Sequence, residues 1–334
     1  MIKLKNFLKL HSLLFYSALI FLVVFSTKSF AAGNNLSWNT WLQNLRTEAI
    51  SQGIQPELFD AVFFQMTPDP SVLSFNKHQP EKRLTFMQYR KTRIDPFRIK
   101  LGRSKYERYQ DLLQSIGYSY GVDPCFITAL WGMETSYGNY LGHFSVPRSL
   151  ATLAYATSRA DYFHNELLIA LHILSEGHVS LDKFKGEWAG ASGQPQFMPS
   201  SWQKYAVDYD GDGHKNIWTS YSDAFASIAN YLKMNGWHQN QPWGLEVQVP
   251  ATVSEDMMVL DHQMPISKWL QMGVRPTDES KLPANYSMLA SVIRPTGGPT
   301  FMVFNNFKVI MKYNNSIFYA ASIGYLADNI CNLD

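Results

Sequence analysis

A single glutamate near the end of an apolar stretch, Glu134, is the residue in this sequence best placed for acid–base chemistry. Asp123 is a favourable N-cap residue, and a proline costs nothing at the first helical position, where Pro124 stands. Gly138 is a typical stop signal, so the spacing predicts a helix that begins at Pro124 and ends before Gly138. Glu134 follows Leu130 by four residues, which places its carboxylate on the apolar face of this helix.

A carboxylate on a buried helix face is expected to have a raised pKa. Burial disfavours the charged form, and so does the negative end of the helix dipole close by. Both effects move the pKa of Glu134 toward the range in which a general acid works near neutral pH. The alternative is a frayed helix end with Glu134 in solvent. Trp131, Tyr137 and Tyr140 favour the first interpretation, because aromatic side chains are suited to stacking on sugar rings.

A second candidate site is a run of alternating carboxylates at Asp208, Asp210 and Asp212. Oxygen ligands at this spacing, with glycine where the chain must turn sharply, match the opening of a calcium-binding loop. The usual acid of the twelfth position is absent because Thr219 stands there, whereas Asp223 would close a longer loop. The sequence predicts a structural Ca²⁺ site, and the alternative is a polar turn without a metal.

Between these two motifs, residues 186–199 are rich in glycine and proline. This composition excludes a long regular element and predicts a loop folded closely against its surroundings. Small residues let a backbone approach a ligand, to which Gln196 would offer a hydrogen bond and Phe197 a flat apolar surface. A purely structural loop has the same composition, so this segment alone is a weak indication of a binding site.

The elements that must position these residues are mainly helices. Helices are predicted within 36–65 (two), over 84–93, 94–118, 149–158, 161–176, 224–235 and 317–330. A connection punctuated by proline and aspartate is predicted over 66–80. Strands are predicted over 245–253, 288–293 and 301–313, which are rich in β-branched and aromatic residues, with a turn at 296–299.

Composition limits the classes of protein and partner. The 334 residues suffice for one large or two ordinary domains with a substantial core. The net charge of +2 and the lack of a Lys/Arg run give no indication of a nucleic-acid partner. An aromatic content of 14% suits a carbohydrate site and also an ordinary core. An exported protein would hold the two cysteines, Cys125 and Cys331, either as a disulfide or as two buried thiols.

The N-terminus has the pattern of an export signal. Basic residues precede an apolar run over 13–25 that is short for a membrane span, and a small-residue cleavage pattern follows at 29–31. We expect a secretory signal peptide over 1–31, cleaved after Ala31 or Ala32. The alternative is an uncleaved membrane anchor. The apolar run is not followed by a cysteine that would accept a lipid, so a soluble exported protein is expected.

Taken in order, the motifs resemble those of one enzyme family. Residues 129–138 (ALWGMETSYG), 188–201 (WAGASGQPQFMPSS), 208–213 (DYDGDG), 228–232 (IANYL) and 313–316 (YNNS) are similar to motifs of the lytic murein transglycosylase B family, glycoside hydrolase family 103. The resemblance covers nearly the whole chain from Trp38 to Ala327. It implies an α+β fold that is predominantly helical, in which a lysozyme-like catalytic core of the goose type carries an accessory helical region and a small β region.

The resemblance also implies the reaction. This family cleaves the MurNAc–GlcNAc β-1,4 bond of peptidoglycan without water as acceptor. Glu134 matches the single catalytic acid, which protonates the glycosidic oxygen while the substrate's N-acetyl group stabilises the anomeric centre. The same carboxylate then takes the proton of the MurNAc 6-hydroxyl, which closes a 1,6-anhydro ring. One residue acting in turn as acid and base obeys microscopic reversibility, so a second carboxylate is not needed.

Further site residues are implied by matching positions of the family. The substrate groove would be formed by Tyr89, Arg159, Glu187, Gln196, Phe197, Tyr231, Tyr313, Asn314 and Tyr319. The calcium ligands would be Asp208, Asp210, Asp212, the carbonyl oxygen of His214 and Asp223. The chain departs from the family at Glu187, which stands in place of the usual serine. If Glu187 shares a groove with Glu134, their repulsion would raise one pKa; the alternative is that Glu187 points into solvent.

The expected organisation is a signal peptide over 1–31, an accessory helical region over 36–105, a catalytic core with an EF-hand-like calcium loop over 106–240, and a β region with a C-terminal helix over 241–334. The expected partner of this periplasmic monomer is the peptidoglycan glycan strand, with no organic cofactor. Two alternatives are open. One is a hydrolytic muramidase on the same scaffold, which would release reducing ends, and the other is a non-catalytic peptidoglycan-binding protein.

Overall fold

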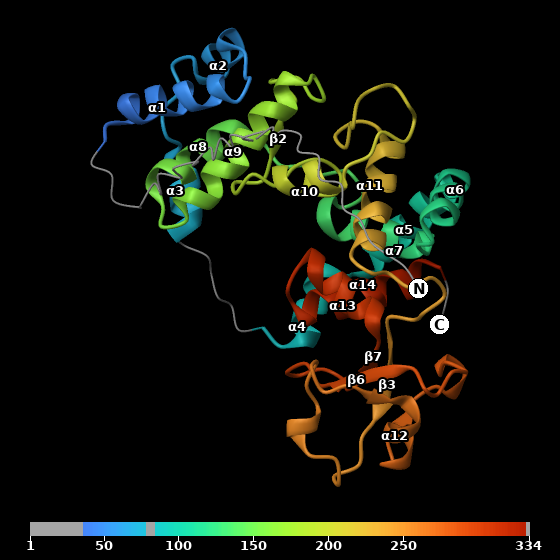
Figure 1. Cartoon of the computed structure of the whole chain (residues 1–334). Helices are drawn as coiled ribbons and strands as arrows, with labels where there is room; N and C mark the ends of the chain where they lie inside the picture. Colours follow the sequence, from blue (N-terminus) through green and yellow to red (C-terminus); the bar gives the residue numbers. More distant parts are fainter. Residues whose placement is uncertain (1–35, 78–83, 332–334) are drawn as a thin grey trace, which may run out of the picture.

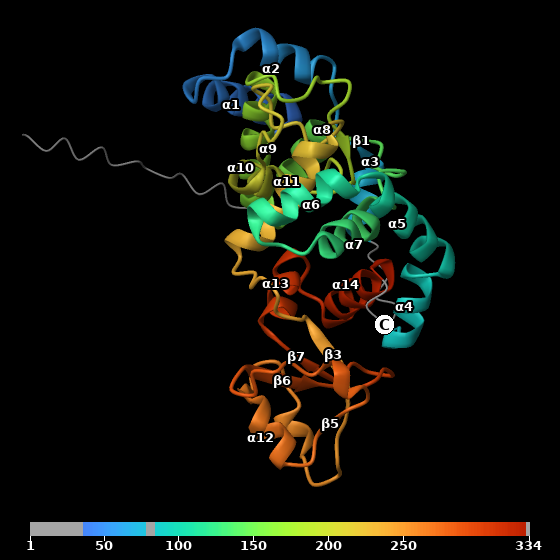
Figure 2. The same ribbon diagram turned by 90° about the vertical axis from the view of Figure 1, so that its right-hand side faces the viewer.

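The computed structural model describes residues 36–77 and 84–331, so the expected signal peptide over 1–31 lies outside the described residues. Three parts follow one another along the molecule (Figures 1 and 2). Helices α1 and α2 form one end, a helical body occupies the middle, and a β region forms the other end. The fold is therefore α+β and predominantly helical, as predicted.

The helices are short to medium in length. They are α1 Trp38–Ser51, α2 Pro56–Phe63, α3 Pro70–Lys77, α4 Phe86–Arg93, α5 Pro96–Arg108, α6 Gln110–Tyr120, α7 Pro124–Thr135, α8 Val146–Ala156, α9 Ala160–Ser175, α10 Pro199–Tyr205, α11 Tyr221–Met234, α12 Ile266–Gln271, α13 Asn305–Tyr313 and α14 Ile317–Ile330. Two 3-10 helices, η1 Glu255–Met257 and η2 Glu279–Lys281, lie in the β region. The strands are β1 Phe144–Ser145, β2 Lys185–Gly186, β3 Gly244–Gln248, β4 Met264–Pro265, β5 Arg275–Pro276, β6 Leu289–Ile293 and β7 Phe301–Val303.

The β region is a closed insertion between α11 and α13. Its five strands are antiparallel in the order β4-β6-β7-β3-β5, and Gly244 pairs with Val303, so the chain enters and leaves side by side. It has a small hydrophobic core of its own, which includes the fully buried Trp269, Met302 and Phe304. The remaining helices, including α13 and α14 beyond the sheet, share one larger core.

Four sequence predictions about elements were wrong. The strand predicted over 245–253 is β3, which ends at Gln248. The strand predicted over 301–313 ends at Val303, and α13 follows it, because the buried residues Phe307 and Ile310 have helical spacing. The helix predicted over 94–118 is broken at Tyr109 into α5 and α6. The ring of Tyr109 packs against Trp131 of α7, with centroids 5.9 Å apart. This contact stabilises the break between α5 and α6. The connection predicted over 66–80 contains α3.

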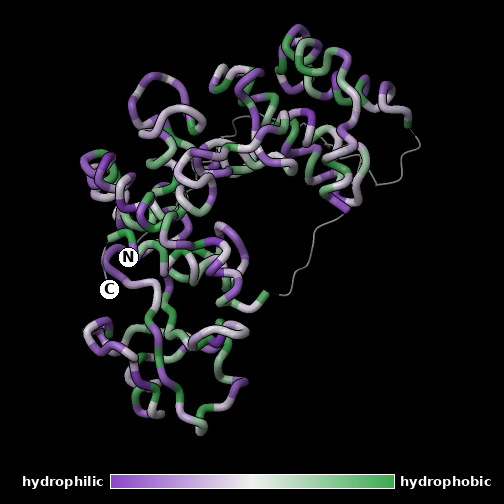
Figure 3. The backbone as a smooth tube through the Cα atoms, turned by 180° about the vertical axis from the view of Figure 1, so that it is seen from behind, coloured by the Kyte–Doolittle hydropathy of each residue, from purple (hydrophilic) through white to green (hydrophobic). Residues whose placement is uncertain are grey.

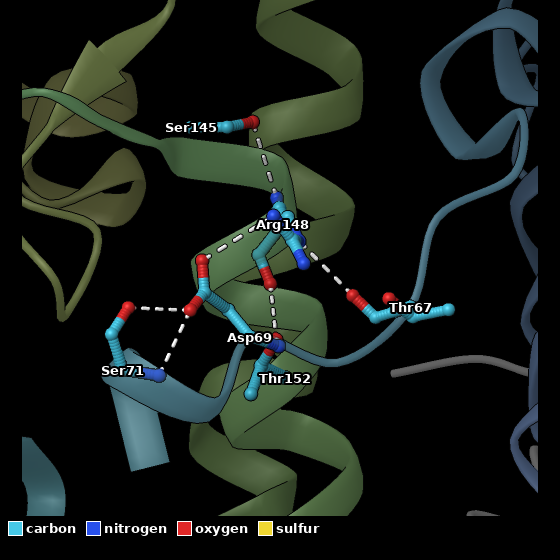
Figure 4. A network of polar contacts seen from close by, with 6 residues as sticks. All are labelled: Thr67, Asp69, Ser71, Ser145, Arg148 and Thr152. Atoms are coloured by element: carbon cyan, nitrogen blue, oxygen red, sulfur yellow. Dashed lines mark hydrogen bonds and ion pairs between the residues drawn. The ribbon is translucent and has the colours of Figure 1, made fainter. Parts of the chain in front are cut away.

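A polar network joins the N-terminal helices to the body (Figure 4). Arg148 of α8 donates to the carbonyl oxygen of Thr67 over 3.0 Å and lies 3.5 Å from the carboxylate of Asp69. The backbone N–H of Asp69 donates to Thr152 Oγ1 over 2.9 Å, and its carboxylate accepts from Ser71 at the start of α3. These bonds fix the chain where it leaves α2 and enters α3 on the surface of α8.

Hydropathy alternates along the chain in both the helices and the β region (Figure 3). This alternation is typical of amphipathic elements that cover a core. Among the described residues, we find no helix with the length and apolar character that crossing a membrane requires.

Candidate active site

The helix that carries Glu134 is α7, and its start agrees with the prediction. Asp123 Oδ1 accepts the backbone N–H of Cys125 over 2.9 Å, and Pro124 occupies the first helical position. Its end was predicted before Gly138, and the helix ends at Thr135. Ser136, Tyr137 and Gly138 then follow with positive φ angles of 51°, 60° and 81°, which turn the chain back on itself. Glu134 therefore lies in the last turn of the helix.

The segment after α7, residues 136–138, is held against the helix by close packing and hydrogen bonds. A side chain at Gly132 would collide with the ring of Tyr137, so only glycine fits at that position. Tyr137 donates to the carbonyl oxygen of Arg98 over 3.0 Å. Arg98 in turn donates to the carbonyl oxygen of Gly132 and, over 3.2 Å, to Ser136 Oγ. A cation at the C-terminal end of a helix is also favoured by the helix dipole.

A buried amide connects α7 to the glycine-rich loop. Gln194 Oε1 accepts the indole N–H of Trp131 over 2.7 Å, and its Nε2 donates to the carbonyl oxygen of Trp218 over 3.2 Å. Thr135 Oγ1 donates to the carbonyl oxygen of Gln194 over 3.2 Å. The residues on both sides of Glu134 are thus held at fixed positions relative to residues 186–199.

The second anchor of α7 is covalent. Cys125 in its first turn forms a disulfide with Cys331, the C-cap residue of α14, with Cα atoms 6.0 Å apart. This settles the alternatives that the sequence left open. The disulfide joins the starting end of the helix that carries Glu134 to the far end of the helix that carries Tyr319.

Burial raises the pKa of Glu134 to about 7, which confirms the expected direction and its first cause. Glu134 is partly exposed as a residue, although its carboxyl group is desolvated. Two contacts oppose the shift: Tyr319 donates its hydroxyl hydrogen to Glu134 Oε1, and the positive charge of Arg93 favours the carboxylate. The balance leaves a carboxyl group that is close to half protonated at neutral pH.

Phenol groups from three elements surround this carboxyl. Tyr89 comes from α4, Tyr313 from the end of α13 and Tyr319 from α14. Burial and the charge of Glu134 raise the pKa of all three, so each is a neutral hydrogen-bond donor at neutral pH. Tyr313 donates its hydroxyl hydrogen to the carbonyl oxygen of Pro195 over 2.6 Å, which attaches the glycine-rich loop to this cluster.

Two further aromatic rings, those of Tyr231 and Phe197, pack against the phenol cluster. The ring of Tyr231 lies 4.6 Å from that of Tyr313, and its hydroxyl donates to the carbonyl oxygen of Lys312 over 2.5 Å. Phe197 lies 5.7 Å from Tyr231 and 5.9 Å from Tyr313 between centroids, and it is only 2% exposed. Phe197 therefore supports the tyrosines and does not present the flat ligand surface that its loop position suggested.

Gln196 is partly exposed and has an unusual backbone. Its φ of 51° places it in the left-handed region, and its Nε2 donates to the carbonyl oxygens of Leu141 and Gly193 over 3.3 and 3.0 Å. Its Oε1 is buried and has no hydrogen-bond partner among the described residues. Strained backbone and an unsatisfied acceptor are both features that cluster at functional sites.

Other predicted residues are not brought to Glu134 by any contact that we observe. Arg159 is exposed at the N-terminus of α9, and its guanidinium lies 4.5 and 5.1 Å from the ring centres of Tyr162 and Phe163. Asn314 is exposed directly after α13. Of the aromatic residues proposed to stack on sugars, Trp131 and Tyr137 are 0% and 1% exposed, so that proposal was wrong for both, whereas Tyr140 is 52% exposed.

Glu187 is partly buried in the turn that follows β2. Burial raises its pKa, and the charge of nearby His143 lowers it. The charged group acting on Glu134 is Arg93. The expected repulsion between the two carboxylates is therefore not what raises either pKa; each is raised by its own burial.

Arg93, Arg98 and Gln194 are site residues that sequence reasoning missed. Arg93 follows Tyr89 by four residues on α4, and its guanidinium lies 5.8 Å from the ring centre of Tyr89. This i,i+4 spacing was a signal that both side chains share a helix face. No comparable local signal exists for Arg98 and Gln194, because their partners are 34 to 63 residues away along the chain.

The predicted calcium loop brings its acidic residues together. Carboxylate oxygens of Asp208, Asp210 and Asp212 all lie within 4.8 Å of one another, an arrangement whose hard oxygen donors fit Ca²⁺. Asp223 is fully buried, and its two oxygens accept the backbone N–H groups of Tyr209 and Asn216, each over 2.8 Å. The side chain of Asp223 thus closes the loop by accepting hydrogen bonds from the backbone of the loop. A bond to a metal would use the remaining lone pairs of these oxygens.

Comparisons with known proteins show the family and the fold of the chain. The family model described as "Transglycosylase SLT domain" matches residues 37–328. Membrane-bound lytic murein transglycosylase B of Escherichia coli (strain K12) is 34% identical over 251 residues, which cover 73% of this chain and 67% of that protein.

Two solved structures extend the likeness. SltB3 from Pseudomonas aeruginosa, in complex with NAG-anhNAM-pentapeptide, has a TM-score of 0.85 and 41% identity over 88% of this chain and 80% of that chain. The Escherichia coli lytic transglycosylase SLT35, in complex with calcium, has a TM-score of 0.76 and 29% identity over 87% of this chain and 93% of that chain. Because the family model spans residues 37–328 and the Escherichia coli relative is 34% identical, the chain belongs to the transglycosylase SLT domain family.

Proposed function

We propose that this protein is a lytic murein transglycosylase that cleaves the MurNAc-GlcNAc β-1,4 bond of peptidoglycan and leaves 1,6-anhydro-MurNAc ends. The observation that carries the proposal is the carboxyl of Glu134, with a pKa of about 7 and a ring of neutral phenol donors around it. Its relative SltB3 is described in complex with NAG-anhNAM-pentapeptide, which contains the anhydro sugar.

The geometry suits two successive proton transfers by one group. A protonated Glu134 donates its proton to the glycosidic oxygen, and the resulting carboxylate accepts the hydrogen bond of Tyr319. The same carboxylate then takes the proton of the MurNAc 6-hydroxyl as that oxygen closes on the anomeric carbon. The pKa of about 7 suits both roles, because neither the proton gain nor the proton loss is strongly uphill at neutral pH.

Hydrolysis is the alternative outcome, and Glu187 is the carboxylate that would have to orient water for it. Its side chain lies near His143. Among the described residues we observe no contact between Glu187 and either Glu134 or the phenol cluster. An intramolecular hydroxyl also has the advantage of proximity over a water molecule. We therefore expect anhydro products, and we expect the variant Glu187→Ser to keep that product type.

The test is mass spectrometry of the muropeptides that the purified protein releases from sacculi. Wild type is expected to release anhydro-MurNAc ends, which are lighter than hydrated ends by one water. Glu134→Gln, which keeps size and hydrogen-bond acceptor but has no acidic proton, should lose roughly 10²–10⁴-fold in rate. Predominantly hydrated ends from wild type would identify a muramidase. Near wild-type release by a folded Glu134→Gln protein would remove Glu134 from the mechanism.

We further propose that Asp208, Asp210, Asp212 and the carbonyl oxygen of His214 hold a structural Ca²⁺, with Asp223 completing the loop. Support comes from the gathered carboxylates and from the calcium complex of the relative SLT35. A ligand that binds only the folded state raises the melting temperature as its concentration exceeds Kd. Ca²⁺ should therefore raise the melting temperature over that in chelator, and Asp210→Ala should abolish the difference. Equal melting temperatures in metal-free and Ca²⁺-loaded protein would leave only a polar turn.

The finer assignments are proposals of the same kind. Tyr89, Gln196, Tyr313 and Tyr319 line the substrate groove beside Glu134, while Tyr231 and Phe197 support it. Arg159, Glu187 and Asn314 contact more distant parts of the glycan or its peptide. The regions over 36–105, 106–240 and 241–334 act as accessory region, catalytic core and β region. The protein works as a monomer in the periplasm, exported by a signal peptide over 1–31 that is then cleaved.

A further inference from the structure

A cavity of about 570 Å³ lies at the end of α7 opposite to Glu134. Asp123 and Pro124, where α7 begins, form part of its lining together with Phe126. Glu134 follows Phe126 by eight residues, which corresponds to about 12 Å along a helix axis. The cavity is thus separate from the phenol cluster, and its volume is in the range of sites that bind small molecules.

The lining combines aromatic rings with side-chain amides. Phe126 and Trp237 meet edge to face with ring centroids 4.8 Å apart. Tyr118, which also lines the cavity, is 88% exposed, a large ring surface without cover. Amide side chains come from Gln114, Gln239, Asn240 and Gln241. Aromatic faces pack against the C–H faces of sugar rings, and carboxamides match the donors and acceptors of hydroxyl and acetamido groups.

The carboxylates of the lining are already engaged within the protein. Asp123 caps α7 through the N–H of Cys125, and Asp328 accepts the indole N–H of Trp243 over 3.1 Å. The amides and rings are therefore the groups best able to contact a ligand. The lining also contains one cation, Lys281, but the four amides and the aromatic rings are the more numerous groups, which favours an uncharged polar ligand over an anionic one.

The loop over 236–241 that supplies three of these amides is preformed and carries unmet hydrogen-bonding capacity. The fully buried Asn306 holds it, accepting the N–H of His238 over 2.8 Å and donating to the carbonyl oxygen of Gln241 over 2.6 Å. Asn240 has a positive φ of 59°. Gln241 Oε1 is buried without a hydrogen-bond partner among the described residues. A buried acceptor without a partner is unfavourable, and a ligand that donates a hydrogen bond at this position would satisfy it.

We propose that this cavity is a second saccharide site, which binds N-acetylhexosamine units of the glycan away from the catalytic glutamate. The proposal rests on peptidoglycan as the substrate of the enzyme. Asn306, at the start of α13, holds the cavity loop, and Tyr313, at the end of the same helix, belongs to the catalytic cluster. Two sites on one rigid scaffold would raise affinity for a polymer without any new contact at Glu134.

The test uses chitotetraose, an uncharged tetramer of N-acetylglucosamine, and the Glu134→Gln protein. The indole N–H signal of Trp237, assigned with Trp237→Phe, reports on the cavity in an NMR titration. We expect this signal to shift to saturation. Adding Gln239→Ala and Asn240→Gly should weaken the Kd at this signal at least tenfold. Glycine accepts the φ of Asn240, so the backbone is preserved.

The matched control is Gln43→Ala, which removes an exposed amide from α1 and should leave the Kd unchanged. Should the double change unfold the protein, Gln239→Ala alone serves, because that side chain is exposed. The proposal is wrong if the Trp237 signal does not move at saturating sugar, or if the variants bind as tightly as the parent.

It is also wrong if only a peptide-bearing muropeptide moves this signal, since the cavity would then be a peptide site. Failure of the proposed function would be seen separately, as the absence of anhydro ends from sacculi treated with wild type.

Discussion

At the scale of single residues, Glu134 combines burial with two stabilising contacts to its charged form. Burial raises its pKa to about 7, whereas Tyr319 and Arg93 pull in the other direction. The direction of the shift followed from the helical spacing of Glu134 and Leu130 alone. Tyr319 lies 185 residues farther along the chain, and no periodicity indicates such a contact. Only the resemblance to a family placed it at the site.

The first prediction concerns pH. Since Glu134 acts first as an acid, the rate should fall as pH rises through about 7, where its proton is lost. The measurement is a pH–rate profile of muropeptide release from soluble glycan fragments under kcat/KM conditions. A rate that stays flat from pH 5 to pH 9 would contradict a role for this proton.

The second prediction concerns stability. The pKa of Glu134 is raised from 4.5 in the unfolded chain to about 7, so the folded protein binds more protons in this window. Stability should therefore fall as pH rises from 4.5 to 7, by about 3 kcal/mol for a shift of this size. Glu134→Gln has no ionisable group at this position, so it does not lose this stability as the pH rises. Its melting temperature should equal that of wild type near pH 4 and exceed it by several degrees at pH 8.

The third prediction separates positioning from chemistry at Tyr319. Tyr319→Phe removes a hydrogen bond that lowers the pKa of Glu134, so the basic limb of the pH–rate profile should move to higher pH. The loss of one hydrogen bond to a charged group corresponds to roughly a tenfold or greater fall in kcat. Tyr325→Phe, on the same helix α14, is the matched control and should change neither. A fall in rate without a shift of the limb would indicate a purely structural role.

At the scale of elements, α7 is held at both ends. The disulfide fixes its start to the end of α14, while Arg98, Tyr137 and Gln194 fix its last turn. The start of this helix was predictable, because capping is local chemistry. The stop signal at Gly138 located its end to within a few residues, but the three successive residues of positive φ were not predictable, since the packing of Tyr137 on Gly132 maintains them. The strand predicted over 301–313 failed for a related reason, as β-branched residues also suit a buried helix face.

The fourth prediction concerns the disulfide. Cys125 and Cys331 are 206 residues apart, and a link that closes so long a loop contributes about 5 kcal/mol in the chain-entropy model. Cys125→Ala with Cys331→Ala should lower the melting temperature and also kcat, because α7 and α14 carry Glu134 and Tyr319. Reduced wild type should behave like the variant, and the variant should not respond to reductant. Unchanged stability after complete reduction would show that packing alone aligns the two helices.

At the scale of the whole molecule, two hydrophobic cores hold the elements that carry and support the site. The larger core holds α7, α11, α13 and α14, and the smaller one lies inside the five-stranded sheet. The sheet also supports α4, since the N–H of Phe86 donates to the carbonyl oxygen of Thr296 over 2.8 Å. Composition indicated a β region near the C-terminus. It did not indicate that the region is a closed insertion, because strand pairing depends on contacts far apart in sequence.

The last prediction follows from the separate core of the β region. Trp269 is fully buried there and donates to the carbonyl oxygen of Ala290 over 2.9 Å. Trp269→Ala leaves a cavity and an unpaired carbonyl, which costs about 3–5 kcal/mol. Because a core of this size is marginal, calorimetry should show the β region unfolding as a separate transition at lower temperature. The main transition should keep its midpoint. Trp202→Ala, in the larger core, is the matched control and should lower the main transition instead. If Trp269→Ala shifts one undivided transition, the β region and the catalytic body unfold as a single cooperative unit, and support of α4 by the sheet is part of the stability of the active site itself.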